Sequence, residues 1–174
     1  MQTITLNKTL EIKRTKKDLE KKLNVKLSLV GKQLSIEGDS FEEYEAQLVL
    51  EAIDLGFSTE KALLLKNEDF VFRKIHIKDH TRRKNLEEVR GRIIGTRGKT
   101  KNTLESLTDS HIMINDSFVS IISPSANIEE ATTAITNIIR GTKQTNAYKF
   151  LEKLNQKDFD SKDGDLGLKE EHEE

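Results

Sequence analysis

Hydrophobic and polar positions repeat in two similar patterns along the chain. In residues 24–57, hydrophobic residues first alternate with polar ones and then recur every three or four positions. Alternation is typical of a half-buried strand, and the longer interval is typical of an amphipathic helix. Residues 110–141 follow the same order, so each stretch predicts two strands followed by a long helix. Gly56 and Gly141 stand where these helices should end, since glycine is favoured just past a helix C-terminus.

The same patterns indicate which side chains should be buried. In the first copy, the expected positions are Val25, Leu27, Leu29, Leu34 and Ile36 on the strands, and Tyr44, Leu48, Ala52 and Leu55 on the helix. In the second copy, they are Ile112, Ile114, Val119, Ile121 and Ile122 on the strands, and Ile128, Ala131, Ile135 and Ile138 on the helix. Shorter segments flank the copies. We expect a strand at 70–77 and helices at 15–23, 58–66, 85–94, 99–108 and 145–154.

Composition and charge narrow the classes of function. The chain has 174 residues and no cysteine, which excludes disulfides, thiolate metal sites and cysteine nucleophiles. We expect a cytoplasmic protein, and no segment is long and apolar enough for a transmembrane helix. Residues 73–101 carry eleven bases and three acids, whereas residues 158–174 carry eight acids and two lysines. This asymmetry suggests a body that binds a polyanion and a disordered acidic tail, although a charge run can also be merely a solvated surface.

The segment Gly91–Asn102, GRIIGTRGKTKN, contains the residues with the clearest chemistry. Its Gly-Lys-Thr ending is found in nucleotide-binding P-loops, but the first glycine of that motif would have to be residue 93, which is Ile93. A P-loop also follows a buried strand, whereas residues 84–94 have a helical pattern. The sequence therefore argues against nucleotide hydrolysis.

The same segment fits a turn between two helices. Gly95 and Gly98 frame a G-x-x-G turn whose lack of side chains allows a phosphate backbone to come close. The following helix N-terminus would point amide hydrogens at an anion. Arg97, Lys99 and Lys101 would add charge. A G-x-x-G turn that precedes a strand pair and a long helix is typical of a KH module, which binds single-stranded RNA.

A KH module also needs an apolar channel for four nucleotides. Ile94, which stands just before the turn, and Ile114 on the adjacent strand are the candidates. Ile112 is equally placed, but we expect it to be a core residue. Residues 85–109 contain no aromatic side chain, so hydrogen bonds and apolar contacts would have to recognise the bases.

These motifs carry a resemblance to a known family. The string from Gly91 to Lys101 and the following strands and helix resemble the tandem KH protein of archaeal and eukaryotic ribosome biogenesis. The resemblance covers about residues 20–155. It implies a non-enzymatic RNA-binding assembly factor that binds near the 3′ end of small-subunit rRNA in the pre-small ribosomal subunit. It also implies a Nob-type PIN-domain endonuclease as partner. The RNA-binding residues that we expect are Arg92, Ile94, Gly95, Thr96, Arg97, Gly98, Lys99, Lys101 and Ile114.

The first module departs from the family pattern. Archaeal relatives often have a G-x-x-G turn there too, but the corresponding place falls near Leu10–Lys13, which contains no glycine. The first module should therefore lack the RNA clamp and part of its first helix. The basic residues between Lys13 and Lys22 could still touch phosphates. Lys16 and Glu20 are spaced for an ion pair on an ordinary solvated helix.

We therefore predict an α+β protein of two tandem type I KH-like modules, with three-stranded sheets packed against helices. The boundaries are 1–66 for a degenerate module with a linking helix, 67–157 for the module with the G-x-x-G loop, and 158–174 for a disordered tail. No cofactor or membrane contact is expected. No metal site is expected either, because His76 and His80 sit in a strand-like pattern and would not share a helical face. The alternatives are a KH protein or RNA chaperone for other RNAs, and a phosphate-binding enzyme that uses Lys99 and Thr100.

Overall fold

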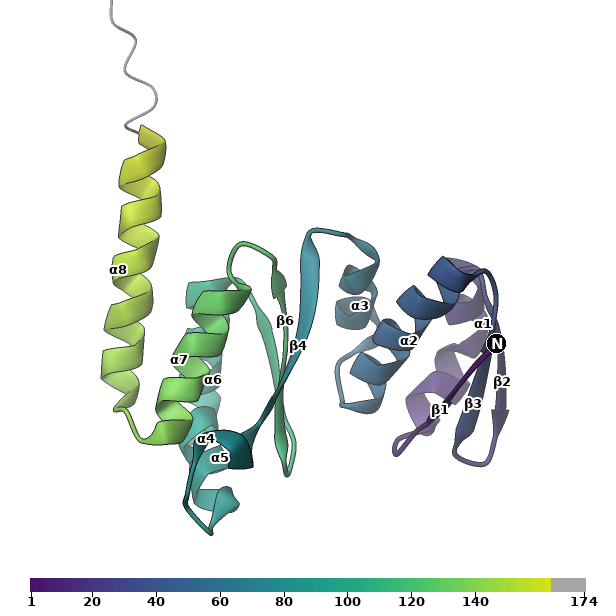
Figure 1. Cartoon of the computed structure of the whole chain (residues 1–174), viewed down its shortest axis with the longest axis horizontal. Helices are drawn as coiled ribbons and strands as arrows, with labels where there is room; N and C mark the ends of the chain where they lie inside the picture. The colour runs from purple at the N-terminus through teal and green to yellow at the C-terminus, as the bar shows by residue number, and fades with distance from the viewer. Residues whose placement is uncertain (164–174) are drawn as a thin grey trace, which may run out of the picture.

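The computed structural model describes residues 1–163, which form two α+β modules stacked along the long axis of the molecule (Figure 1). The first module contains β1 (Gln2–Thr5), α1 (Leu10–Leu23), β2 (Lys26–Val30), β3 (Gln33–Glu37), α2 (Ser40–Asp54), α3 (Thr59–Ala62) and the 3-10 helix η1 (Leu63–Lys66). The second contains β4 (Phe70–His76), α4 (Ile77–His80), α5 (Leu86–Ile94), the 3-10 turn η2 (Thr96–Gly98), α6 (Lys99–Thr108), β5 (His111–Ile114), β6 (Phe118–Pro124), α7 (Ile128–Arg140) and α8 (Gln144–Asp163).

Each module has a three-stranded antiparallel sheet, in the orders β1-β3-β2 and β4-β6-β5. This confirms the predicted α+β architecture. The alternation in the strands predicted the buried positions well, since Leu27, Leu34 and Ile36 lie in one core and Val119 and Ile121 in the other. The third strand of the first sheet, β1, was not predicted, because its sequence QTIT has a single large apolar residue and is too short to show a period.

Two helices are longer than the sequence pattern indicated. Helix α1 begins at Leu10, five residues before the predicted start, and its buried Ile12 extends the core face by one turn. Helix α8 reaches Asp163, so residues 158–163, which we expected to belong to the tail, are helical. The chain has neither glycine nor proline between Gln144 and Asp163, so nothing in this stretch stops the helix. The rest of the predicted tail, residues 164–174, lies outside the described residues.

Helix α2 corrects one prediction about the core. The side chains that fill the first module are Ala46, Val49, Leu50 and Ile53. Of the predicted face, Ala52 is buried and Leu48 is half-buried, but Tyr44 is 57% exposed. The helix lies between two sheets (Figure 1) and therefore carries two apolar faces, of which the sequence pattern revealed only one.

The second sheet is covered on both faces. Helices α5, α6 and α7 lie on one side, and α2 and α3 of the first module lie on the other (Figure 1). Ile122 of β6 belongs to the core of the first module, and Phe72 packs against that core. The rings of Phe57 and Phe72 meet edge-on, with centroids 6.4 Å apart. The two modules therefore share apolar contacts rather than being joined by a linker alone.

Polar contacts close the rim of this interface. Lys74 Nζ lies 2.6 Å from Glu51 Oε1, and Asn115 Nδ2 donates to the carbonyl oxygen of Leu55 over 3.1 Å. These two bonds join the second module to α2 and to Leu55, which follows it. The apolar contacts beneath them supply most of the stabilisation, because exposed ion pairs contribute little.

We expect Phe57→Ala to lower the free energy of unfolding by about 3–5 kcal/mol, because it empties a buried site between the modules. Urea unfolding followed by circular dichroism should still show one transition for the whole chain, at lower urea. Val30→Ala, at a side chain that is 75% exposed, is the control and should leave the midpoint nearly unchanged. Two separate transitions in the wild type would show that the shared contacts do not couple the modules.

Candidate nucleic-acid interface

The candidate site begins where α5 ends. Val89 and Ile93 bury one face of this helix, and Asn85 caps its start by accepting hydrogen bonds from the amides of Glu87 and Glu88. The helical segment ahead of the glycines and the antiparallel sheet are both foreign to a P-loop, which follows a strand of a parallel sheet. The structure therefore has the helix before the glycines that the sequence predicted, and not the strand that would precede a P-loop.

Gly95 is required by the fold itself. Its backbone has φ 73° and ψ 175°, and its amide donates to the carbonyl of Gly91 over 2.8 Å. A Cβ at this position would lie 2.2 Å from Thr100 Oγ1 and 2.7 Å from the backbone nitrogen of Thr100. Gly95 therefore allows the chain to turn tightly against the first turn of α6.

Gly98 has a different environment. Its φ is 75°, but a Cβ there would meet no atom within 4 Å, so this side of the turn is open. Arg97 also has positive φ, at 52°, which is unusual for a residue with a side chain. The backbone of residues 97–98 is consequently presented outwards, with room for a ligand to approach it.

Helix α6 starts directly after this turn without a side-chain cap. Gly98 occupies the cap position, and the first turn contains no acid but does contain Lys99 and Lys101. Most helices begin with a capping oxygen or an acidic residue, because the free amides there favour negative charge. At α6 the chain supplies neither, so an external anion can take this place.

Lys101 lies on the face of α6 that is turned towards β5. Its Nζ is 3.8 Å from Glu105 Oε1, and that carboxylate accepts a hydrogen bond from the amide of Ile112 over 2.7 Å. Ile112 is 1% exposed and is a core residue, as predicted. Ile94 is 39% exposed beside the turn, whereas Ile114 is half-buried against the core. Of the two predicted base contacts, Ile94 is thus the more accessible.

A second face of α6 was missed by the sequence analysis. An open hollow of about 960 Å³ lies beside the turn and is lined by Thr96, Arg97, Lys99, Asn102, Thr103, Ser106 and Leu107. This lining has two cations, several hydrogen-bond donors and no acid. The signal was available in the sequence, because Lys99, Asn102, Thr103 and Ser106 recur at helical spacing without an acidic residue among them.

Arg92 is engaged within the fold rather than free at the turn. Its guanidinium donates to the carbonyl oxygen of Thr142 over 2.8 Å, and Gln144 Nε2 donates to the carbonyl oxygen of Arg92 over 3.2 Å. Arg92 therefore joins α5 to the turn between α7 and α8. A phosphate contact, as the sequence analysis expected, would compete with this bond.

His111 adds no positive charge at this edge of the sheet at neutral pH. Partial burial lowers the pKa of its imidazole, and the nearby charge of Lys61 lowers the pKa further, whereas Glu105 and Asp109 act in the opposite direction. Because an unperturbed histidine is already mostly neutral at pH 7, the lowered pKa leaves His111 neutral. Lys101, rather than His111, therefore supplies positive charge on this side of α6.

The first module lacks such a turn. Its β1 is joined to α1 by four residues, and the carboxylate of Asp54 accepts hydrogen bonds of 2.7 Å from the amides of both Asn7 and Lys8. Leu10–Lys13, where a glycine turn was sought, is the first turn of α1. Lys16 and Glu20 form the ion pair that their spacing predicted, 3.8 Å apart. An acid of the chain itself thus occupies amides that precede α1.

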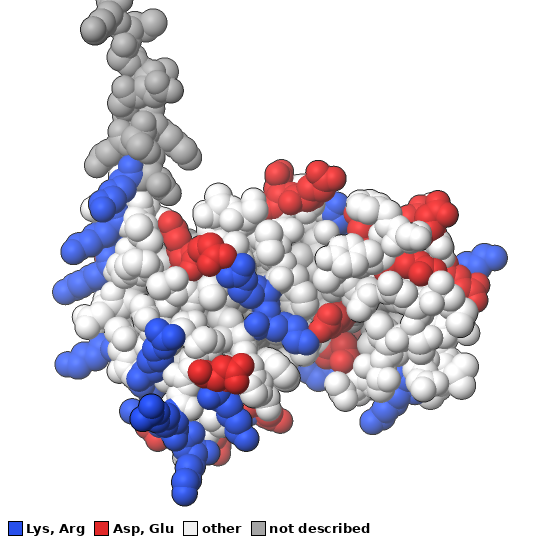
Figure 2. Space-filling model, viewed as in Figure 1, with Lys and Arg blue, Asp and Glu red and all other residues white. Residues whose placement is uncertain are grey.

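On the face drawn in Figure 2, positive and negative side chains gather over different elements. Figure 2 shows Lys and Arg side chains along α8 and around α4 and α5, while acidic side chains gather near α2 and the start of β4. The described residues contain no group of three or more His, Asp or Glu side chains that could hold a metal, and His76 instead contacts Asp79. No helix within residues 1–163 has the length and hydrophobicity needed to cross a membrane.

The two glycines of the turn should respond differently to alanine. Gly95→Ala should lower the free energy of unfolding by about 3 kcal/mol or more, because the Cβ collides with Thr100 in a backbone conformation open mainly to glycine. Gly98→Ala should cost only about 1–2 kcal/mol, from positive φ alone. Urea unfolding of both variants measures this difference. Equal losses would mean that Gly95 is not sterically confined.

Comparisons with known proteins agree with this geometry. Residues 71–156 match the model of the second KH domain of PNO1 proteins, described as a eukaryotic-type KH domain (KH-domain type I). The matched range contains the turn, its two helices, the second sheet and most of α8. The match therefore covers the candidate site as a whole.

Curated relatives extend the similarity. A KH domain-containing protein of Methanocaldococcus jannaschii is 32% identical over 149 residues, which cover 82% of this chain and 66% of that protein. The RNA-binding protein PNO1 of Oryzias latipes is 32% identical over 57% of this chain and 42% of its own length. The pre-rRNA-processing protein pno1 of Aspergillus oryzae is 26% identical over 76% of this chain and 55% of its own length. The chain thus spans between four-tenths and two-thirds of these relatives.

Solved structures show the same fold. The chain is similar to aDim2p of Pyrococcus horikoshii, which was crystallised in a complex with a/eIF2alpha and rRNA. The identity is 28% and the TM-score 0.80, with 90% of this chain and 94% of that chain covered. By its fold and by these matches, the chain carries a type I KH domain of the PNO1 and Dim2 family.

Proposed function

We propose that this protein is a single-stranded RNA-binding assembly factor of the small ribosomal subunit. It would bind near the 3′ end of small-subunit rRNA during pre-rRNA processing in the cytoplasm, without catalysing a reaction. The observation that carries the proposal is the turn Gly95–Gly98, whose open backbone leads into the uncapped start of α6. The names of the relatives and the rRNA in the similar complex support the choice of RNA.

In this mechanism the turn clamps the RNA backbone. A phosphate approaches the open side of Gly98 and accepts hydrogen bonds from backbone amides in the first turn of α6, which no side chain caps. Arg97, Lys99 and Lys101 neutralise neighbouring phosphates, and bases lie beside Ile94 and Ile114. Thr96 lines the hollow next to the turn, so a strand can continue along Asn102 and Thr103. Arg92 contributes by holding α5 in place.

The first module, residues 1–66, would serve mainly as a platform. Asp54 satisfies the amides before α1, and the shared contacts with β4 and β6 hold the second module in position. In a pre-small ribosomal subunit, this arrangement would leave the outer surfaces of the platform for a protein such as a Nob-type PIN-domain endonuclease. Pull-down with that endonuclease would separate this scaffold role from RNA binding.

The clamp can be tested with fluorescence anisotropy. The probes are a single-stranded oligonucleotide matching the mature 3′ end of small-subunit rRNA and a scrambled oligonucleotide of equal length. We expect wild-type protein to prefer the rRNA sequence, and Thr96→Asp/Arg97→Asp to weaken binding at least about tenfold while remaining folded. Arg14→Asp/Thr15→Asp changes the same residue types by the same charge on α1 and should bind normally.

Each outcome of this experiment points to a definite function. Equal affinity for both oligonucleotides, still lost in the loop variant, would favour a KH protein or RNA chaperone for other RNAs. A loop variant that binds as well as the wild type would remove the turn from the site. If the α1 variant alone lost binding, the first module would be the RNA-binding part.

The salt dependence of binding counts the phosphate contacts. If Arg97, Lys99 and Lys101 each neutralise one phosphate, log affinity should fall with log salt concentration at a slope of about −2, from about −0.7 per contact on a single strand. A slope near −3 would indicate that Arg92 leaves Thr142 and joins them. A slope near zero would contradict the clamp.

A further inference from the structure

A groove between the modules is separate from the RNA-binding turn. It has a volume of about 290 Å³ and lies between the start of α2 and the start of β4, with no lining residue in common with the hollow beside Gly95–Gly98. Its apolar walls come from both modules. They include Phe41, Tyr44 and Leu48 on α2 and Phe70 and Phe72 on β4.

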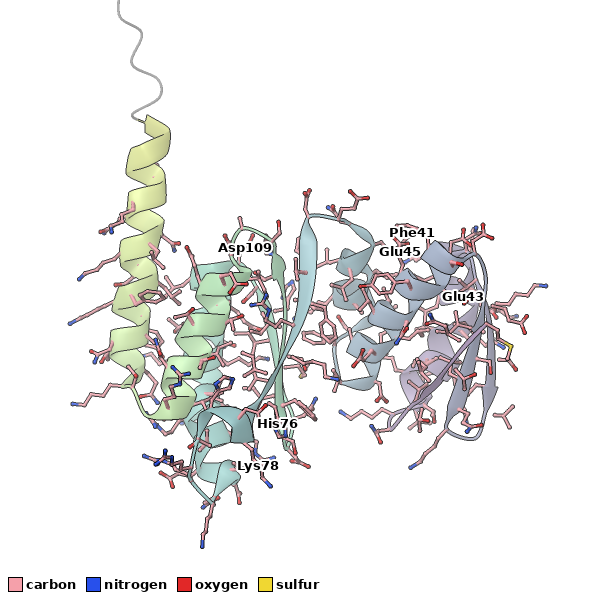
Figure 3. All side chains as sticks on the ribbon, viewed as in Figure 1. Phe41, Glu43, Glu45, His76, Lys78 and Asp109 are labelled. Carbon is pink, nitrogen blue, oxygen red and sulfur yellow. The ribbon has the colours of Figure 1, made fainter. Side chains whose placement is uncertain are left out.

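The apolar face of α2 extends beyond the sheet that it covers. Phe41, Tyr44, Glu45 and Leu48 follow helical spacing, so they share one face of the helix. Leu48 is half-buried against the core of the first module, but Tyr44 is 57% exposed and Phe41 65% exposed. Figure 3 shows Phe41 and Glu45 at the end of α2 that is remote from α4. No element among residues 1–163 covers these two aromatic side chains, in a chain that has only nine.

The negative charge around this groove indicates which kind of partner could bind there. Glu45 and Glu68 line it, and within residues 1–163 neither side chain makes a hydrogen bond or an ion pair. The one lining cation, Lys66, donates to the carbonyl oxygen of Lys22 over 2.6 Å. Acidic side chains gather on the surface around it (Figure 2). Such a rim repels the phosphates of RNA and of lipids and attracts lysine and arginine.

We propose that this groove binds a short basic segment of a partner protein. An apolar side chain of the segment would insert between Phe41, Tyr44 and Phe70, and flanking Lys or Arg residues would pair with Glu45 and Glu68. A groove of this size accepts an anchoring side chain rather than a folded domain, and aromatic residues in such places typically supply most of the binding energy. Because the groove is remote from the RNA-binding turn, both ligands can be held together.

The experiment is selection of phage-displayed twelve-residue peptides on the immobilised full chain. The peptides that bind are then synthesised and their affinities measured by isothermal titration calorimetry. We expect enriched peptides to combine a large apolar residue with Lys or Arg. Phe41→Ser/Tyr44→Ser should weaken their binding at least about tenfold, and Glu45→Lys/Glu68→Lys should do the same by reversing the rim charge. Leu10→Ser, at a side chain that is 71% exposed outside the groove, should have no effect.

Other results would overturn the proposal. Peptides that bind the Phe41→Ser/Tyr44→Ser variant as tightly as the wild type would place their site elsewhere. Enriched peptides without basic residues, or with acidic ones, would contradict the role of the rim. Dimerisation of the wild type that this variant abolishes, seen by sedimentation velocity, would assign the groove to a second copy of the chain. A matching loss of oligonucleotide affinity would assign it to RNA.

Discussion

The contact between α2–α3 and the second sheet is the constraint on which the rest of the structure depends. A KH sheet with helices on one side leaves its other face apolar, and here Phe72 and Ile122 lie on that face. The first module covers it with the ring of Phe57 and the neighbouring helices. Because β5 and β6 are held from both sides, α6 and the turn before it are set against a rigid layer. The geometry of the candidate clamp is thus supported from behind, by residues on the opposite face of the sheet.

The two modules share one fold but differ at the start of the helix that precedes their second strand. Free backbone amides before a helix need an acceptor, which can come from inside the chain or from a ligand. In the first module, Asp54 accepts hydrogen bonds from the amides of Asn7 and Lys8 just before α1, and the acid Glu11 stands in the first turn of α1, although Thr9 provides no side-chain cap. In the second, Gly98 leaves α6 without a cap and without an acid. If the second module binds RNA as proposed, the two modules differ in whether the negative charge near the helix start comes from the chain or from a ligand.

Sequence patterns predicted most elements, because the strands alternate and α7 has one continuous apolar face. These patterns failed to predict contacts between elements that are distant in the sequence. Helix α2 contacts two sheets, so its second face could not be recognised without knowing that the modules stack. Arg92 belongs to the basic stretch around the turn, yet the fold engages it at Thr142, and no local pattern encodes that bond. The glycine turn was found because its requirement is local, as the distance from Gly95 to Thr100 shows.

The shared core has a consequence for genetics. Ile122 belongs to the second module by sequence but to the core of the first by packing. If the turn binds RNA as proposed, a damaging substitution among the buried residues of the first module would disturb the strand behind the candidate clamp and be scored as an RNA-binding defect. Screens that locate binding residues from loss-of-function mutations would then mark positions far from any nucleotide. In this protein such a map would outline the support of the clamp as well as the clamp.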